Sequence, residues 1–351
     1  MSLERFEVQR FRCLSDVALD LAPGWNLFTG ANASGKTSLL EALYFLGRGR
    51  SFRGVPNRQL VQTSADGLST FGRVSISGQT HKLGAGWADG ALRCRKDGAE
   101  LNSAAELAAT FPAQVLDPEA HQLVSGSPHN RRRFLDWMVF HVEPGFMAAW
   151  RRYQQALRQR NAALRANPQQ IAEWDQALAS AGEALHAQRV GVADALAVEI
   201  PLHVRALTGL EVSVELNPGW SGDGLLAALN TSLAGDREAG FTHPGPHRAD
   251  LVLRLDGRRA RDQLSRGQEK LVAIGMVLAQ LTTLARSATY PALLVDDPAA
   301  ELDRSHLATL IESLTELPNQ LFVTSLDASG FAVPKSANTF HVERGVVVSS
   351  R

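Results

Sequence analysis

The spacing of apolar residues predicts two long helices in the middle of the chain. Over residues 146–164 and 171–192, larger apolar side chains recur every three or four positions with polar residues between them. Asn167-Pro168 lies between the two stretches and predicts a break, because proline cannot continue a helix. We expect the second helix to end before Pro201 and the two helices to form an antiparallel hairpin, with the apolar stripe as its packing seam.

The regions on either side of this hairpin alternate between strand-like and helix-like stretches. Expected strands lie within residues 3–29, 68–101, 211–216, 251–255, 292–295 and 321–326, and expected helices span residues 34–47, 265–284 and 305–317. A closing hairpin is expected over residues 339–349. The alternation predicts an α/β fold with a mostly parallel sheet, to which residues 68–101 add antiparallel strands.

Composition and charge leave the partner of the chain open. The 351 residues are 44% hydrophobic and 21% charged, as in a soluble globular protein large enough for two lobes. No apolar run is long enough for a membrane span, and the first residues lack a signal peptide's apolar stretch. Cys13 and Cys94 form no CxxC pair, so we expect a cytoplasmic protein. The net charge is zero, so only local basic clusters could favour a nucleic acid.

GANASGKT, residues Gly30–Thr37, fits the phosphate-loop pattern G-x-x-x-x-G-K-[ST] at every fixed position. An apolar strand precedes it and a helix follows, so backbone N–H groups and the helix dipole would face phosphate oxygens. Lys36 would neutralise the β- and γ-phosphates of ATP, and the Thr37 hydroxyl would bind Mg²⁺. The alternative is a glycine-rich turn without a ligand. The expected nucleotide contacts are Gly30, Asn32, Ala33, Ser34, Gly35, Lys36, Thr37 and Ser38.

In PALLVDDPAAELD, residues 291–303, the two carboxylates Asp296 and Asp297 directly follow a short apolar stretch. Four apolar residues without alternation indicate a strand buried on both faces, and open α/β sheets bind ligands at the carboxyl ends of such strands. Asp296 would hold Mg²⁺, and Asp297 would orient or deprotonate the attacking water, with Lys36 as the second catalytic residue. The alternative is that the aspartates cap the next helix or are merely solvated.

LSRGQEK, residues 264–270, opens an apolar helix and offers a second site for an oxyanion. One phosphate loop already accounts for the nucleotide of this chain. We therefore expect Ser265, Gly267 and Gln268 to contact the γ-phosphate held by a second subunit, in a homodimer that shares two ATP molecules. The alternative is a plain serine cap.

Taken in order, GANASGKT, LSRGQEK, LLVDD and Glu301-Leu302-Asp303 resemble the Walker A, signature, Walker B and D-loop segments of ABC ATPases. The stretches FRCLSDVALDLAPGWNLFTGANASGKTSLLEALYFLGRGRSFR, PHNRRRFLDW and GPHRADL are similar to the RecF family. The resemblance adds Asp303 to the expected nucleotide contacts. It implies an ABC-ATPase head formed by residues 1–120 and 245–351, with residues 121–244 as an inserted, mainly helical lobe.

The same resemblance implies a function. It implies ATP-dependent dimerisation on double-stranded and gapped DNA without sequence preference, and slow DNA-stimulated ATP hydrolysis. It places the chain in recombinational repair, replication and the SOS response, loading a recombinase with partners similar to RecR and RecO. Asp297 stands where transporters carry glutamate, and Ser325 where they carry the switch histidine; both differences favour slow hydrolysis. The glutamine loop that contacts Mg²⁺ is expected near Val115–Pro118.

Arginine clusters are the candidate DNA contacts, because guanidinium groups bind phosphates without reading base sequence. The clusters are Arg48, Arg50 and Arg53; Arg131, Arg132 and Arg133; and Arg258, Arg259 and Arg261. Each could instead be a solvated face, and Arg131–Arg133 could pair internally with acidic residues. No helix-turn-helix or zinc-finger pattern is present, and the prolines between His243 and His247 argue against a metal site.

Two other classes share the phosphate loop. The nucleotide-binding subunit of a membrane transporter would need the switch histidine and a surface for its membrane partner. A small-molecule P-loop kinase would leave LSRGQEK unexplained.

Overall fold

The computed structural model describes residues 1–166, 171–327, 334 and 336–350. The chain forms two compact units, Met1–Ala120 with Ala288–Arg351, and His121–Ser287. The second unit ends at residue 287, whereas the lobe expected from the sequence spanned residues 121–244. The division into an ABC-ATPase head and an inserted lobe stays a prediction. The predicted break at Asn167-Pro168 lies outside the described residues.

The first unit contains an antiparallel sheet in the order β2-β1-β4-β5-β6-β7. Its inward face is a row of buried apolar side chains, as alternation along exposed strands requires. The strands are β1 (Ser2–Phe11), β2 (Leu14–Asp20), β4 (Gly67–Ile76), β5 (Gln79–Ala88), β6 (Ala91–Lys96) and β7 (Ala99–Glu100). The strands expected within residues 3–29 and 68–101 are therefore confirmed.

A second sheet in the same unit has the order β15-β14-β3-β13-β12-β8. Its strands run parallel except for the closing hairpin of β14 and β15. β3, β12 and β13 are buried along their whole length, as their unbroken apolar runs predicted. The strands are β3 (Trp25–Thr29), β8 (Ala113–Leu116), β12 (Ala292–Val295), β13 (Leu321–Ser325), β14 (Asn338–Glu343) and β15 (Val346–Ser350).

Helix α1 (Lys36–Arg48) packs against strands of both sheets, and its apolar residues join the core that they share. It begins two residues later than expected and ends at Arg48, where the C-cap Gly49 has a φ of 61°, the left-handed conformation that glycine adopts at little cost. The remaining helical elements are η1 (Asn57–Leu60), α2 (Ala104–Thr110), α8 (Pro298–Glu301) and α9 (Arg304–Glu316), with η2 (Pro118–Leu123) at the boundary of the units.

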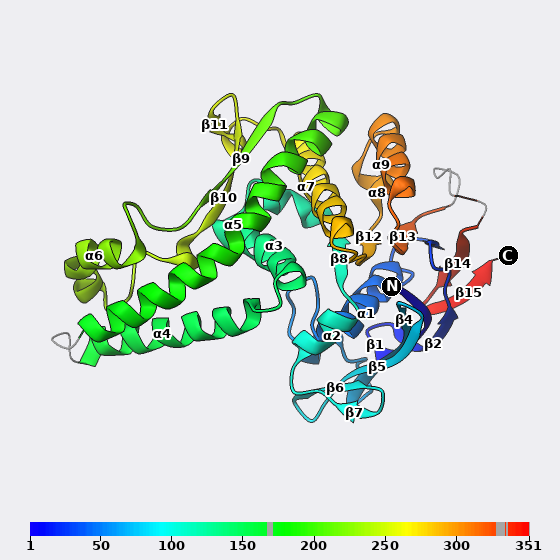
Figure 1. Cartoon of the computed structure of the whole chain (residues 1–351). Coiled ribbons are helices and arrows are strands. Elements are labelled where there is room, and N and C mark those ends of the chain that lie inside the picture. Colours follow the sequence, from blue (N-terminus) through cyan, green and yellow to red (C-terminus); the bar gives the residue numbers. More distant parts are fainter. Residues whose placement is uncertain (167–170, 328–333, 335, 351) are drawn as a thin grey trace. The chain divides into compact units, whose positions relative to one another are not determined.

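The second unit is mainly helical and carries one small antiparallel sheet of order β11-β10-β9. α4 and α5 pack against each other, which confirms the predicted hairpin (Figure 1). The helices are α3 (Pro128–Val142), α4 (Phe146–Ala166), α5 (Ala172–Thr208), α6 (Leu225–Ala239), α7 (Arg266–Arg286), η4 (Pro246–Arg248) and η5 (Ala260–Asp262), and the strands are β9 (Val212–Asn217), β10 (Asp250–Leu255) and β11 (Arg258–Arg259).

Helix α5 does not end before Pro201, so that prediction is wrong. The helix continues to Thr208, with Pro201 inside it. Proline removes one intrahelical hydrogen bond and typically costs about 3 kcal/mol. Ile200 and Val204 are nevertheless buried, and α5 packs along α7 so closely that a Cβ on Gly275 would lie 2.9 Å from a Val204 methyl group. Burial of this face outweighs the local penalty.

Candidate nucleotide site

The phosphate loop connects β3 to α1 and requires both of its fixed glycines. A Cβ on Gly30 would lie 2.2 Å from the Val342 carbonyl oxygen. Gly35 has a φ of 116°, which disfavours any other residue. The helix begins immediately afterwards at Lys36, and its first N–H groups lack intrahelical acceptors. The loop therefore presents donors and the positive end of a helix, as an anion site requires.

The Lys36 side chain is folded over this loop. Its Nζ atom donates hydrogen bonds to the carbonyl oxygens of Gly30 at 2.5 Å and Ala31 at 2.9 Å. Only 7% of the residue is exposed, so its charge acts in a medium that screens less than water. The amine is thus held at the mouth of the loop.

Thr37 and Asp296, the two side chains predicted to hold Mg²⁺, are in contact. The Thr37 hydroxyl lies 3.0 Å and 2.9 Å from the two Asp296 carboxylate oxygens. They meet because β3 and β12 both lie beside β13, so that the carboxyl ends of all three strands share one edge of the sheet. Topology brings together residues that are 259 positions apart in the sequence.

Thr324 positions the carboxylates, a role that the sequence analysis did not predict. Its hydroxyl donates to the Asp296 carboxylate at 2.8 Å and accepts from the Asp297 backbone N–H at 2.9 Å. It is fully buried near the end of β13. A threonine inside an otherwise apolar buried strand was the available signal, because a buried hydroxyl must find partners.

Asp297 has the properties of a poised carboxylate. It adopts a left-handed conformation with φ 45° and ψ 56° at the N-terminus of α8. Its Oδ1 atom is buried and makes no hydrogen bond within the described part of the chain. Burial raises the pKa of this carboxyl; the Lys36 charge opposes the rise and Asp296 adds to it. A raised pKa in a strained loop suits a group that receives a proton.

Asp117 is a third carboxylate at this edge, and it occupies the segment where the glutamine loop was expected. It follows β8, whose Leu116 carbonyl accepts a hydrogen bond from the Asp296 N–H at 2.8 Å. Burial raises the pKa of Asp117 to about 6, and the charges of Asp296 and Glu119 add to that rise. Val115–Pro118 therefore does lie beside the site, but it contributes an aspartate and no glutamine.

These side chains fit Mg²⁺. The ion prefers oxygen ligands and usually combines one or two protein groups with water and substrate phosphates. Thr37 and Asp296 supply those groups, and the buried Ser34 Oγ and Asp297 Oδ1 atoms have unused hydrogen-bonding capacity. Across the described ranges, no set of three or more His, Cys, Asp or Glu side chains could enclose a metal by itself.

The signature segment lies in the second unit, where Ser265 caps α7. Its hydroxyl accepts from the Gln268 N–H at 3.3 Å, and the Gln268 side chain accepts from the Ser265 N–H at 3.0 Å. The structure thus contains the helix cap that was the alternative interpretation. The Ser265 hydroxyl hydrogen is not used by the cap and can still be donated. Gly267 is exposed alongside.

Asp303 is also a helix cap, in the first unit. Its carboxylate accepts hydrogen bonds from the N–H groups of Ser305 at 2.9 Å and His306 at 3.0 Å. These donors hold the pKa of Asp303 well below its usual range. Ser325, in place of a switch histidine, is buried at the end of β13 beside Thr29. A contact between Asp303 and nucleotide stays a prediction.

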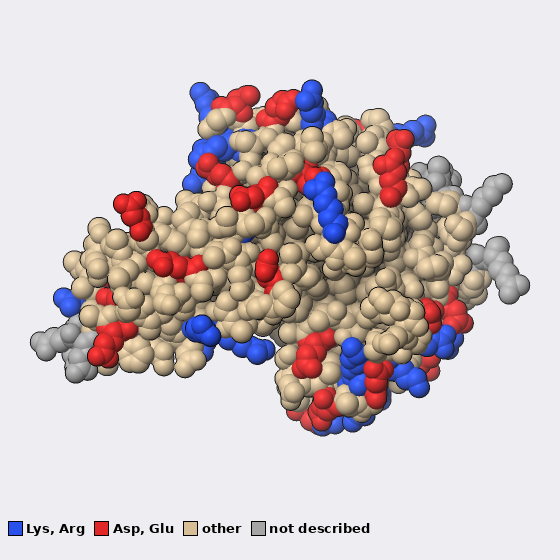
Figure 2. All heavy atoms as spheres, in the orientation of Figure 1, with Lys and Arg blue, Asp and Glu red and all other residues tan. Residues whose placement is uncertain are grey.

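The arginines expected at DNA differ in their exposure. Arg50, Arg53 and Arg133 are exposed, and Arg132 is half-buried with a hydrogen bond to the Ala249 carbonyl at 2.7 Å. Arg131 is only 4% exposed and pairs internally, as the alternative interpretation held, so it is unavailable to a DNA backbone. Figure 2 shows basic and acidic side chains interspersed on the visible face, which matches the zero net charge.

The sequence profile described as "RecF/RecN/SMC N terminal domain" matches residues 2–347. A Pseudomonas aeruginosa (strain LESB58) protein named DNA replication and repair protein RecF is 39% identical over 359 residues, covering 99% of this chain and 97% of its own. The chain belongs to the RecF family. A Pseudomonas putida (strain GB-1) protein of the same name is 40% identical over 363 residues, covering 100% of this chain and 99% of its own.

Solved structures confirm the ABC-ATPase fold of this RecF-family chain. A structure described as the recombination mediator protein RecF with ATP in the RecFOR pathway superposes with a TM-score of 0.89 at 26% identity, covering 100% of this chain and 98% of its own. An Smc head superposes with a TM-score of 0.63 at 15% identity, covering 100% of this chain and 98% of its own, a similarity of fold alone. No described helix combines the length and the apolar composition that crossing a membrane would require.

Proposed function

We propose that the chain binds ATP and Mg²⁺ at its phosphate loop and hydrolyses ATP slowly. The observation that carries this proposal is the contact of Thr37 with Asp296, beside a loop over which Lys36 is already folded. Groups placed in advance need little reorganisation when phosphate and metal arrive. ATP in the solved structure of a RecF relative supports the assignment.

Each residue of the site has a distinct task in this proposal. Lys36 exchanges its loop carbonyls for the β- and γ-phosphates, and the loop N–H groups orient the same phosphates. Thr37 and Asp296 would hold Mg²⁺, which neutralises charge that develops on the phosphoryl oxygens. Asp297 orients the attacking water and accepts its proton, and Thr324 keeps both aspartates in place. The aspartate side chain is one methylene shorter than glutamate, which favours slow turnover.

We further propose that ATP joins two copies of the chain. Ser265, Gly267 and Gln268 would contact the γ-phosphate held by the other copy, and Asp303 would approach the same shared nucleotide. The free hydroxyl hydrogen of Ser265 and the positive end of α7 support this role. The dimer would close on double-stranded or gapped DNA, with Arg50, Arg53, Arg132 and Arg133 as exposed or half-buried contacts to the backbone.

The relatives suggest the cellular process. Curated relatives carry the name DNA replication and repair protein, and the solved relatives are described as recombination mediators of the RecFOR pathway. We propose that this chain likewise works with RecO- and RecR-like proteins to load a recombinase at gaps, and that DNA stimulates its ATPase activity.

Molar mass by light scattering tests the shared-nucleotide mechanism. The protein is measured with ADP, with ATP, and with ATP plus a gapped duplex. We expect the protein mass to double only with ATP and the dimer to be strengthened by DNA. Ser265→Arg should bind ATP and stay monomeric. The large arginine side chain would prevent the start of α7 from approaching the γ-phosphate held by the other copy. Lys36→Arg should impair nucleotide handling itself.

The control is Thr231→Arg, which adds the same side chain at an exposed position of α6. A Ser265→Arg protein that dimerises with ATP as well as the control would contradict the shared site. Wild-type protein that remains a monomer in every condition would favour the kinase alternative, whereas co-purification with membranes would favour the transporter subunit.

A further inference from the structure

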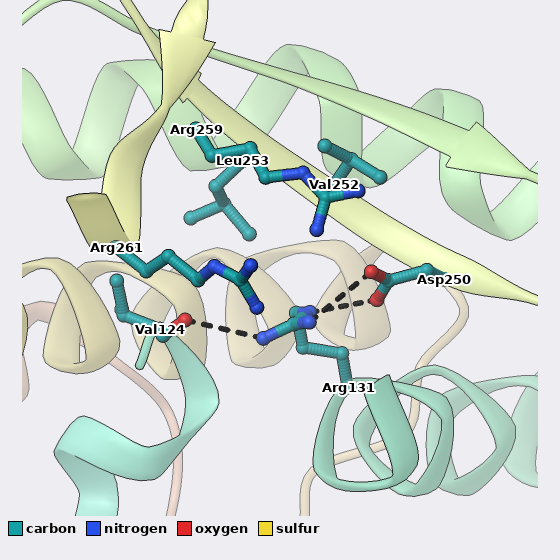
Figure 3. A pocket seen from close by; sticks show the side chains of 7 residues that line it. All are labelled: Val124, Arg131, Asp250, Val252, Leu253, Arg259 and Arg261. Carbon is teal, nitrogen blue, oxygen red and sulfur yellow. Dashed lines mark hydrogen bonds and ion pairs between the residues drawn. The ribbon is translucent and has the colours of Figure 1, made fainter. Parts of the chain in front are cut away.

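Three arginines of the second unit converge on one recess beside β10 (Figure 3). Arg131 on α3 forms its floor together with Asp250, and Arg259 on β11 and Arg261 on η5 extend over that pair. The recess has a volume of about 250 Å³, including the part open to solvent. Its other walls are the apolar side chains Val124, Val252 and Leu253.

The floor of the recess is fixed and close to neutral. Arg131 forms a two-pronged ion pair with Asp250, with N–O distances of 2.7 Å and 3.1 Å. Its remaining terminal nitrogen donates to the carbonyl oxygens of Leu123, Val124 and Gly126. The Arg131 and Asp250 side chains are 5% and 10% exposed. Asp250 is thereby committed to Arg131 and cannot also neutralise the other two arginines.

Arg259 and Arg261 give the recess an excess of positive charge. Both are exposed residues, and Figure 3 shows their guanidinium groups directed towards the Arg131–Asp250 pair. Arg261 also lies 3.3 Å from the neighbouring Asp262, a pair at the surface. Three guanidinium groups therefore surround one carboxylate inside the recess. Like charges that converge in this way repel one another unless an anion lies between them.

We propose that this recess binds a phosphate group of the DNA backbone. Guanidinium groups pair with phosphate oxygens through two parallel hydrogen bonds, and the two exposed arginines can approach one phosphate from two sides. The proposal rests on the proposed DNA-binding function, to which it assigns a specific contact.

A salt titration of DNA binding tests the proposal. Arg259→Gln/Arg261→Gln removes the two exposed charges and leaves the buried floor intact. Arg151→Gln/Arg158→Gln is the matched control, because both are exposed arginines on α4, away from the recess and from the basic clusters considered for DNA. Binding of a fluorescent duplex is measured by anisotropy over a range of salt concentrations. The recess variant should bind more weakly than the control, and its slope of log K against log salt should be shallower by about one.

Inorganic phosphate distinguishes a recess that binds the DNA backbone from one that binds a free phosphate ion. At constant ionic strength, replacing chloride by phosphate should raise the melting temperature of the wild type and of the control more than that of the recess variant, because the phosphate loop is intact in all three proteins and only the recess differs. If the recess variant and the control differ in their response to phosphate but bind DNA equally, the site binds a free oxyanion and the DNA assignment is overturned. If the wild type binds no DNA at all, the proposed function fails and the phosphate series still decides the site. Equal behaviour of recess variant and control in both series overturns the proposal.

Discussion

Replacing Asp117 by asparagine should stabilise the nucleotide-free protein at neutral pH and leave its stability below pH 3.8 unchanged. Asp117 lies next to Asp296 at the carboxyl edge of the parallel sheet, and burial together with the charges of Asp296 and Glu119 raises its pKa from 3.8 to about 6. The Glu119 N–H donates to Asp117 Oδ1 at 3.1 Å, and the asparagine oxygen can accept the same bond. The substitution therefore removes the charge and keeps the geometry.

The expected magnitude follows from the shift in pKa. A folded-state pKa above the unfolded value means that the native state favours the protonated carboxyl. The stability contributed by this group is fully present below pH 3.8 and is lost as the pH rises through 6. This rise in the pKa of Asp117 corresponds to about 3 kcal/mol of unfolding free energy. That value is an upper one, because water and counter-ions partly relieve the cost of burying the charged carboxylate.

Urea unfolding between pH 4 and pH 8, without nucleotide, measures this effect. The wild type should lose stability relative to Asp117→Asn as the pH rises from 4 to 7, and the difference should stay constant above that. Asp16→Asn, an exposed position on β2, is the control for the loss of one surface carboxylate. A stability difference between wild type and Asp117→Asn that does not change with pH would refute the reasoning.

Three further substitutions test other parts of the structure. Arg160→Met should cost about 3–5 kcal/mol, because it leaves two buried carboxylates without their shared partner, whereas the exposed Arg158→Met should be near neutral by thermal denaturation. Thr324→Val should lower kcat for ATP more than it raises KM, since the carboxylates that it positions act in hydrolysis; an unchanged kcat would exclude the positioning role. Pro201→Ala should raise the melting temperature by restoring a helical hydrogen bond, and a fall would show that the packing of α5 requires the proline.

The sequence predicted most of the helices and strands. Buried strands such as residues 292–295 have unbroken apolar runs, and the phosphate-loop pattern predicted a strand before the loop and a helix after it, as the structure has them. These predictions succeed because the signal is local. A helix stripe, a strand run or a loop that wraps a phosphate is set by residues that are close together in the chain.

Features that depend on distant partners were missed or left open. Asp250, the partner that buries Arg131, is 119 positions away, so internal pairing was only the alternative interpretation of that cluster. Thr324 acquires its role only when β13 lies beside β12. The continuation of α5 past Pro201 depends on packing against α7, which local propensity does not contain. Each failure is a case of tertiary context overriding a local signal.

The phosphate loop and the arginine recess should bind phosphate with different dependence on salt concentration. The Lys36 amine is buried over a loop of backbone donors, where mobile ions screen little. Arg259 and Arg261 are exposed, so their contact with a DNA phosphate competes directly with counter-ions. Raising salt should therefore weaken DNA binding steeply while ATP affinity changes much less. Equal salt dependence of the two affinities would mean that the nucleotide is held mainly by exposed charge, contrary to the buried geometry of the loop.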